Sequence, residues 1–423
     1  MALSRRLFLK NTGLGLLALG LPPSFLVRAA EGEKKNRGKV LVVIFQRGGM
    51  DGLNAVIPFK ERAYYSLRPS IAVPEPSSGE ERAIDLDGFY GFHPALAQLK
   101  ILFDKGHLAI VHATGSPDNT RSHFDAQDYM EIGTPGIKST PDGWLNRCLK
   151  GKKGESSPFR GVAVSSRLPR ILAGSAPALT MSSMEEFRIR DESFGAALQR
   201  LYANSTDPLL HQGAQSLFEA MTLLRKVESG IPSKTEGYPN GRFGAGLGQI
   251  ARLIKANVGL EIAFTEIEGW DTHVNQGGAS GAMANRLKEL AQALAAFYHD
   301  LGDRMEDVVL LTLSEFGRTV RENGNRGTDH GHANIMFVLG GKVNGGRVYG
   351  RWPGLEPDVL YEGRDLALTT DFRAVCGEVL SRHMGLKDFS NAFPGYKFPS
   401  HPLGIIHLTP RAVPSPILSI LNK

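Results

Sequence analysis

The sequence predicts an α/β fold with a mostly parallel sheet. Continuous apolar runs such as residues 40–45 and 308–313 are typical of strands that are buried on both faces. Longer stretches between such runs, of which residues 284–301 are the clearest, have the 3.6-residue spacing of amphipathic helices. Strands that alternate with helices along the chain are the pattern of this fold class.

The first part of the chain carries this alternation. Leu96, Leu99 and Leu102 recur at helical spacing and predict a helix, and a stretch before it, rich in Pro, Ser and Glu, predicts a loop. After the strand at residues 40–45, the predicted elements are this loop, this helix, a strand and a second helix: residues 72–85, 93–105, 108–112 and 122–132.

The middle of the chain is less regular and mainly helical, and the alternation then returns. The middle helices are predicted at residues 191–202, 208–229 and 243–257. The later elements are strands at residues 260–264, 308–313 and 335–339 and helices at residues 284–301 and 371–385. We therefore predict one large domain over residues 38–423, with a helical insertion at about residues 185–257.

Residues 1–30 are predicted to be a twin-arginine export signal. Arg5 and Arg6 stand in the stretch SRRLFLK, an apolar run broken by two prolines follows, and small residues end it near Ala29. A membrane span takes about 20 apolar residues, which neither this run nor any later stretch supplies. We expect a periplasmic or otherwise exported protein that meets the twin-arginine translocase during export.

Charge and cysteine content exclude two other classes of protein. The leader carries four of the six units of formal net positive charge, so the rest of the chain is near +2. Without a basic stripe interleaved with aromatic residues, the sequence indicates no nucleic-acid partner. Cys148 and Cys376 are too few for a four-cysteine zinc site, and their pairing is left open.

Chemically active side chains follow the predicted strands. Open α/β sheets bind ligands beyond the carboxyl ends of their strands, so these side chains should meet at one edge of the sheet. In chain order they are Arg47 and Asp51; Arg121, Ser122 and His123; Asp271 and His273; and Glu315, Arg318, Asp329, His330 and His332.

A group of this composition indicates a metal site. Carboxylate oxygens and imidazole nitrogens suit Zn²⁺, with Mn²⁺, Fe, Ca²⁺ or Mg²⁺ as alternatives. The candidate ligands exceed what one tetrahedral ion needs and suffice for two: Asp51, Asp271, His273, Asp329, His330 and His332. Two ions about 4 Å apart can hold both the attacking and the leaving oxygen of a phosphoryl displacement.

Ser122 is the candidate nucleophile and Arg121 the candidate anion-binding residue. A helix N-terminus and a nearby cation both favour the alkoxide form of a serine and the anion that it attacks. Arg47 and Arg318 are further candidates for holding a phosphate or sulfate through two hydrogen bonds.

Three of these residues have structural alternatives that the sequence leaves open. Ser122 could cap its helix, a role that is compatible with catalysis. Glu315 could bind metal or pair with Arg318, three residues further on. His123 could be a ligand or could hold a ligand in place through a hydrogen bond.

The chain resembles a bacterial family called domain of unknown function 1501. The resemblance runs from Lys39 to about Gly385 and rests on the leader and on FQRGGMDGLNAVIPF, RSHFDAQDYME, GWDTH, LSEFGRT, GTDHG and TTDFRAV, in that order. The family is grouped with the alkaline-phosphatase-like superfamily of phosphatases, sulfatases and phosphoglycerate mutases. The resemblance implies a three-layer α/β/α fold with one or two metal ions at the strand ends.

The resemblance also implies roles for single residues. Asp51 matches the carboxylate after the first strand, and Ser122 matches the nucleophile that opens a helix. Asp271 with His273, and Asp329 with His330 and His332, match the remaining ligands. In this chain Asp51 sits inside a glycine-rich turn, and Asp329 comes fourteen residues after Glu315 rather than directly after the strand.

Three functional hypotheses follow. The first is an exported metal-dependent hydrolase of a small phosphate or sulfate ester, in which Ser122 attacks. The second, from another class, is a non-catalytic binding or assembly protein on the same fold. The third is a metal hydrolase that uses a bound hydroxide in place of Ser122.

Overall fold

A nine-stranded mixed sheet runs through the protein. The computed structural model describes residues 37–77, 79, 81–151, 157–187, 192–204, 206–230 and 237–407. The predicted leader, residues 1–30, lies outside them.

The sheet is ordered β11-β5-β10-β9-β1-β8-β6-β7, and β12 pairs with β5. Only β10 runs antiparallel to its neighbours, so the predicted α/β fold with a mostly parallel sheet is confirmed. The strands are β1 (Val40–Gln46), β5 (Leu108–Gly115), β6 (Gly161–Val164), β7 (Leu179–Met181), β8 (Ile262–Ile267), β9 (Val308–Leu313), β10 (Asn334–Gly340), β11 (Val348–Tyr349) and β12 (Thr370–Asp371).

The central strand β1 faces two hydrophobic cores. Val40, Val42 and Ile44 pack into one core, and the alternate residues Leu41, Val43 and Phe45 pack into the other. Side chains of a strand alternate between the two faces of a sheet, so a strand covered on both sides must be apolar at every position. The continuous apolar run at residues 40–45 has this cause.

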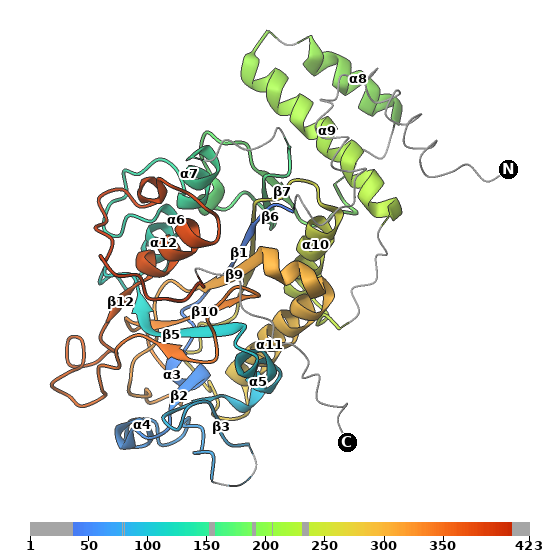
Figure 1. Ribbon diagram of the computed structural model, residues 1–423. Helices are drawn as coiled ribbons and strands as arrows, with labels where there is room; N and C mark the ends of the chain where they lie inside the picture. The colour runs from blue at the N-terminus through green and yellow to red at the C-terminus, as the bar shows by residue number, and fades with distance from the viewer. Residues whose placement is uncertain are drawn as a thin grey trace, which may run out of the picture.

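Helices cover both faces of the sheet (Figure 1). α5, α10 and α11 pack on one face, and α6, α7 and α12 pack on the other. The bounds are α5 (Ala97–Asp104), α6 (His123–Ile132), α7 (Trp144–Gly151), α10 (Arg242–Ala256), α11 (Ala282–Leu301) and α12 (Phe372–Arg382), with short 3₁₀ segments at Pro94–Leu96, Arg170–Leu172, Gly302–Asp307 and Phe389–Ala392.

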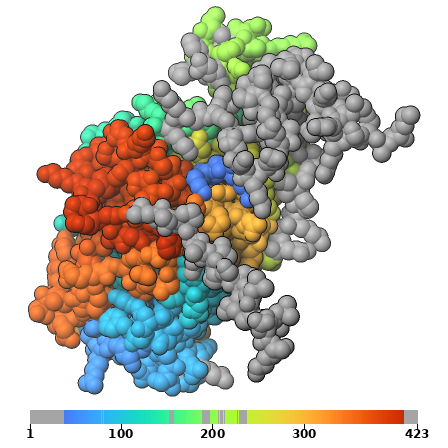
Figure 2. Space-filling view, viewed as in Figure 1, coloured from blue at the N-terminus to red at the C-terminus, as the bar shows by residue number. Residues whose placement is uncertain are grey.

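A small antiparallel sheet lies beside the main one and covers a third core. Its strand order is β2-β4-β3, with two short helices before and after β2. This part of the chain, blue in the space-filling view, lies at the foot of the molecule below the orange segment that contains β11 (Figure 2). The elements are α3 (Gly52–Ala55), β2 (Val56–Pro58), α4 (Arg62–Leu67), β3 (Ile84–Asp85) and β4 (Tyr90–Phe92).

Two helices project from the body beyond the β6–β7 edge of the sheet (Figure 1). They are α8 (Glu192–Ala203) and α9 (Pro208–Gly230), which pack against each other. α9 joins the core beside α10 through Ala220, Leu223, Leu224 and Val227. These three helices occupy the segment predicted as an insertion, and the single-domain interpretation stays a prediction.

The long predicted elements all appear in the structure, whereas the short elements of the structure were not predicted from the sequence. Strand β8 begins two residues later than predicted, and a strand of two residues, β3, ends the predicted loop at residues 72–85. Strands of two to four residues are too short for an alternation of side chains to be recognised. The strands missed for this reason are β2, β3, β4, β6, β7, β11 and β12, and the helices missed are α3, α4 and α7.

Two further expectations meet the structure here. Cys148 and Cys376 are both buried, and both are free thiols. Across the described parts of the chain, we find no helix whose length and apolar character would let it cross a bilayer.

Two buried histidines should make the stability of the fold depend on pH. His112 faces the carbonyl of Val56 and His383 faces the carbonyl of Val40, and burial lowers the pKa of each ring to about 4. The unfolded chain takes up protons near pH 6.5 that the folded protein refuses, so stability is complete above that pH and is lost as the pH falls toward 4. Each histidine should contribute about 1.4 kcal/mol per pH unit in this window.

Urea unfolding of the wild type and a His112→Gln variant between pH 7 and pH 4.5 tests this expectation. In the His112→Gln variant, the slope of the unfolding free energy against pH should fall by the contribution of about one proton. His299→Gln, at an exposed position, should keep the wild-type slope. An unchanged slope in the His112 variant would contradict the assignment.

Candidate metal centre

Five chain segments meet at one edge of the main sheet. The carboxyl ends of β1, β5, β8 and β9 lie at this edge, and the antiparallel β10 begins there. Residues 314–333, between β9 and β10, therefore return to the edge from which they left. This reversal brings GTDHGHA, residues 327–333, to the ends of the other strands.

Glycines allow the loops at this edge to touch. Gly48 has a φ of 119°, and a Cβ there would stand 2.7 Å from the backbone nitrogen of Asp271. A Cβ at Gly327 would stand 2.3 Å from the carbonyl carbon of His273. Larger residues at either position would push the loops apart.

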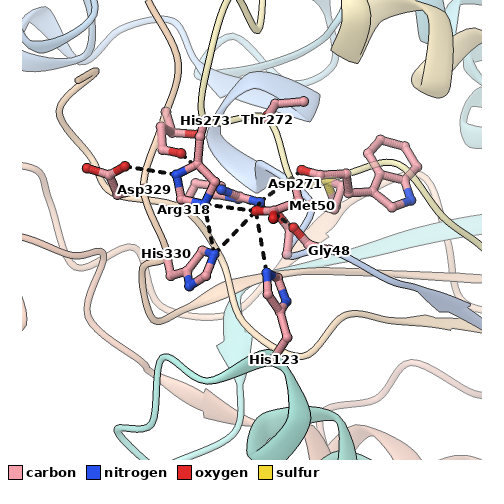
Figure 3. Close-up of polar contacts among 12 residues, drawn as sticks. Gly48, Met50, His123, Asp271, Thr272, His273, Arg318, Asp329 and His330 are labelled. Atoms are coloured by element: carbon pink, nitrogen blue, oxygen red, sulfur yellow. Dashed lines mark hydrogen bonds and ion pairs between the residues drawn. The ribbon is translucent and has the colours of Figure 1, made fainter. Parts of the chain in front are cut away.

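Three imidazole rings point at one carboxylate oxygen (Figure 3). The Nε2 atoms of His273, His330 and His123 lie 3.0, 3.2 and 3.4 Å from Oδ1 of Asp271. The Nε2 atoms of His273 and His330 are themselves only 2.9 Å apart. His123 opens α6, Asp271 and His273 follow β8, and His330 precedes β10. The ligand atoms of His123, Asp271 and His330 all lie within 4.8 Å of one another, a group that could hold a metal ion.

The other nitrogen of each ring is held by an acceptor. Nδ1 of His123 lies 2.8 Å from Glu315, and Nδ1 of His273 lies 2.9 Å from Asp329. Nδ1 of His330 lies 2.7 Å from the carbonyl oxygen of Arg121. Acceptors at Nδ1 place the proton there and leave the Nε2 lone pair for a metal, which is how proteins commonly orient histidine ligands.

Electrostatics at the centre fit a cation. Burial lowers the pKa of His330 and favours its neutral form. With Nδ1 protonated, the lone pairs of His273 and His330 face each other across 2.9 Å, an arrangement that a cation bound by both nitrogens stabilises. Imidazole nitrogens with one carboxylate are a donor set that suits Zn²⁺.

Arg318 fixes the carboxylate of Asp271. Its buried guanidinium donates to Oδ1 of Asp271 over 2.6 Å and also to backbone carbonyls of all three neighbouring loops, at Gly48, Gly49, Trp270 and Thr328. Burial acts to raise the pKa of Asp271, but the hydrogen bond and charge of Arg318 outweigh it and bring the pKa to about 2. Asp271 is therefore ionised at neutral pH.

Glu315 holds the ring of His123 in place through a hydrogen bond. Its buried Oε1 accepts from His123, from Gln127 and from the backbone nitrogen of Gly48, each over 2.8 Å. Burial acts to raise the pKa of Glu315, but these hydrogen bonds lower it, and the same contact raises the pKa of His123. The sequence left open whether Glu315 binds metal or pairs with Arg318, and in the structure its ion-pair partner is His123.

Asp329 should matter for metal affinity without touching the metal. It accepts from His273 and from Asn323, and the hydrogen bond with His273 lowers its pKa. An Asp329→Asn variant should bind Zn²⁺ about 10–100-fold more weakly, because the His273 ring loses the acceptor that orients it. Competition with a chelator measures this, and Asp303→Asn, at an exposed position outside the site, should match the wild type.

Asp329 was predicted as a ligand and instead accepts from His273 and Asn323, and two more predicted ligands also have other partners in the structure. The buried carboxylate of Asp51 accepts from Arg68 over 2.6 Å and from Gln276 over 2.7 Å. The His332 ring stacks on Tyr361 with their centroids 4.2 Å apart, and burial lowers its pKa.

The predicted catalytic residues, Arg121 and Ser122, directly precede His123 in the chain, and the carbonyl oxygen of Arg121 lies 2.7 Å from Nδ1 of His330. Ser122 is the N-cap of α6, where its hydroxyl accepts from the backbone nitrogen of Asp125 over 3.5 Å. Arg121 donates to Glu362 and Asp365, both over 2.7 Å. Arg47 donates through all three guanidinium nitrogens to Glu266, Gln127 and Glu131.

Sequence reasoning missed the uncharged residues that hold the centre together. Gln127 lies four residues after His123 and so on the same face of α6, a signal that was available. Asn323 and Gln276 stand in irregular loops, where no periodicity indicates which way a side chain points.

Comparisons with known proteins place the chain in a family. Residues 106–393, about two thirds of the chain, match the family model described as protein of unknown function (DUF1501). A search of curated proteins found no match.

Solved structures show a distant similarity. The C-terminal periplasmic domain of EcEptC from Escherichia coli, in complex with Zn, has a TM-score of 0.34 at 10% identity, over 73% of this chain and 74% of that one. The lipoteichoic acid synthase LtaP from Listeria monocytogenes has 0.35 at 10%, over 83% and 73%. The PsFucS1 sulfatase from Pseudoalteromonas sp. has 0.32 at 13%, over 76% and 66%. No residue of this chain receives a role from similarity at this level.

Proposed function

The chain belongs to the DUF1501 family of proteins of unknown function, and we propose that it is an exported, metal-dependent hydrolase of phosphate or sulfate esters. One observation carries the proposal. Three imidazole Nε2 atoms converge on Oδ1 of Asp271, while each ring is held at Nδ1 by an acceptor. Export is supported by the twin-arginine pattern of residues 4–10.

The residues that would hold the ion are His123, Asp271, His273 and His330. A divalent cation there would stabilise the negative charge that develops on the ester oxygens during hydrolysis. Arg318 keeps Asp271 ionised and in place, and Glu315 holds the ring of His123 in its orientation. These contacts support a site that is arranged before a substrate arrives.

Ser122 is the proposed nucleophile. It directly precedes His123, and its hydroxyl stands at the N-terminus of the ten-residue helix α6, where the helix dipole favours negative charge. Attack by Oγ forms a bond to the phosphorus or sulfur, the bond to the alcohol oxygen breaks, and the alcohol leaves with the serine proton. Water then hydrolyses the seryl ester and releases phosphate or sulfate.

A Ser122→Ala variant tests this role against capping. Loss of a cap costs about 1 kcal/mol of stability and leaves turnover intact, whereas loss of the nucleophile abolishes turnover. Ser122→Asn is the matched control, because asparagine caps a helix as well as serine does but cannot attack.

Turnover of aryl phosphates and aryl sulfates by the zinc-loaded protein is the measurement. Activity in the wild type that is absent in both variants supports the proposal. Activity that survives in both supports a hydrolase that uses a bound hydroxide. A wild type that binds zinc but turns over neither ester favours the binding-protein alternative.

A further inference from the structure

The three candidate anion-binding arginines differ in how many donors they have to spare. Arg47 and Arg318 use every guanidinium nitrogen on partners inside the protein. Both bonds of Arg121 leave from Nη2, and among the described residues nothing accepts from its Nε or Nη1. Because its Nε is buried, Arg121 is the candidate that keeps one donor, Nη1, available to an anion beside the Nη2 atom that its two acceptors share.

The two acceptors of Arg121 are unlike each other. Asp365 is fully buried and is shared with Arg364, whose Nε lies 2.9 Å from it. Glu362 is 46% exposed and is bound by Arg121 over 2.7 Å. Glu362 also has a φ of 51°, in the left-handed region that residues other than glycine rarely occupy. If the ion pair with Arg121 breaks, water can solvate the exposed carboxylate of Glu362 but cannot reach the buried carboxylate of Asp365.

These contacts attach the turn at residues 361–365 to the candidate metal centre. Arg364 donates to the carbonyl oxygen of His330, whose Nδ1 faces the carbonyl oxygen of Arg121. Two guanidinium groups, of Arg121 and Arg364, are balanced here by the carboxylates of Asp365 and Glu362. If Glu362 moves away, one positive charge is left beside His330.

We propose that Glu362 is an internal counter-ion that occupies the anion site of Arg121 and is displaced by the anionic group of the substrate. The inference rests on the proposed function, in which Arg121 holds that group. Glu362 then sets how tightly anions bind to Arg121. A monoanion carries the same charge as the Glu362 carboxylate and gains little by replacing it, whereas a more highly charged phosphate group interacts more strongly with the guanidinium than the carboxylate does. Removing the carboxylate should strengthen the binding of every anion.

Isothermal titration of the zinc-loaded full chain with inorganic phosphate tests the proposal. Exposed ion pairs contribute little, so Glu362→Gln should tighten phosphate binding by about two- to fivefold. Glu289→Gln is the matched control, because Glu289 pairs with the part-exposed Arg286 over 2.7 Å and should leave phosphate binding unchanged. Arg121→Gln should weaken binding, and adding Glu362→Gln to that variant should then have no effect.

The outcomes separate this inference from the proposed function. Equal phosphate affinity in the wild type and Glu362→Gln overturns the counter-ion role, even where esters are hydrolysed through Ser122. A gain in Glu362→Gln that persists without Arg121 also overturns it. A gain that requires Arg121, found in a protein that hydrolyses no ester, supports the anion site and sinks the hydrolase.

Discussion

Replacing Asp271 with alanine should weaken zinc binding by at least about a hundredfold. Residues that merely orient a ligand contribute about 10–100-fold to metal affinity, and Asp271 supplies the oxygen on which all three rings converge. The variant also removes the negative charge that attracts a cation to the three imidazole nitrogens.

Chelator competition and elemental analysis of the purified protein measure this effect, beside a His330→Ala variant that should also lose metal. Asp271→Asn separates charge from shape, since the amide oxygen can still accept from Arg318 but carries no negative charge. The zinc affinity of Asp271→Asn should fall between that of the wild type and that of Asp271→Ala. Wild-type zinc affinity in Asp271→Ala would sink the assignment of the centre.

Replacing Arg318 with methionine should destabilise the fold by about 3–5 kcal/mol. Its side chain is buried and binds Asp271 together with four carbonyls on three loops. The change leaves the carbonyls of Gly48, Gly49 and Thr328 without this donor and takes the guanidinium from Asp271, whose side chain is 46% exposed. Each buried polar group left without a partner costs about 1–3 kcal/mol, so several together account for the expected loss.

Urea unfolding of the metal-free protein measures the loss without interference from zinc binding. Arg286→Met is the matched control, because Arg286 is 42% exposed and pairs with Glu289, and about 1 kcal/mol or less is expected for an ion pair with an exposed partner. Arg318→Lys should restore little, since one ammonium group lacks the fork of donors that reaches several loops. A loss below about 1 kcal/mol in Arg318→Met would contradict the proposed tethering.

The sequence predicted the frame of the fold because the frame depends on long regular patterns. The run at residues 40–45 identified a central strand, since both of its faces are buried. The direction of β10 could not be predicted, because an apolar run reads the same in a parallel and an antiparallel strand. That direction decides which end of β10 carries the candidate ligands.

Within the candidate centre, position after a strand brought Asp271, His273 and His330 into consideration, and the structure brings their side chains together. Position alone could not separate them from Asp51, whose carboxylate is bound by Arg68 of the segment after α4. Nor could it show the role of Arg318, because most of its partners are backbone carbonyls, which every residue has. Partners of this kind are set by how loops pack, and loop packing leaves no pattern in the sequence.

The pairing of β1 has a consequence for how the protein is made. β1 lies between β8 and β9, so its two neighbours are synthesised more than 200 residues after it. At about 5–20 residues per second, roughly 15–55 s pass before the ribosome has made both of them. Through that interval a strongly apolar strand has exposed edges, and the chain should depend on chaperones to stay free of aggregation. On the proposed function, a metal ion could bind only after the segment that carries His330 has been made, and that segment follows β9.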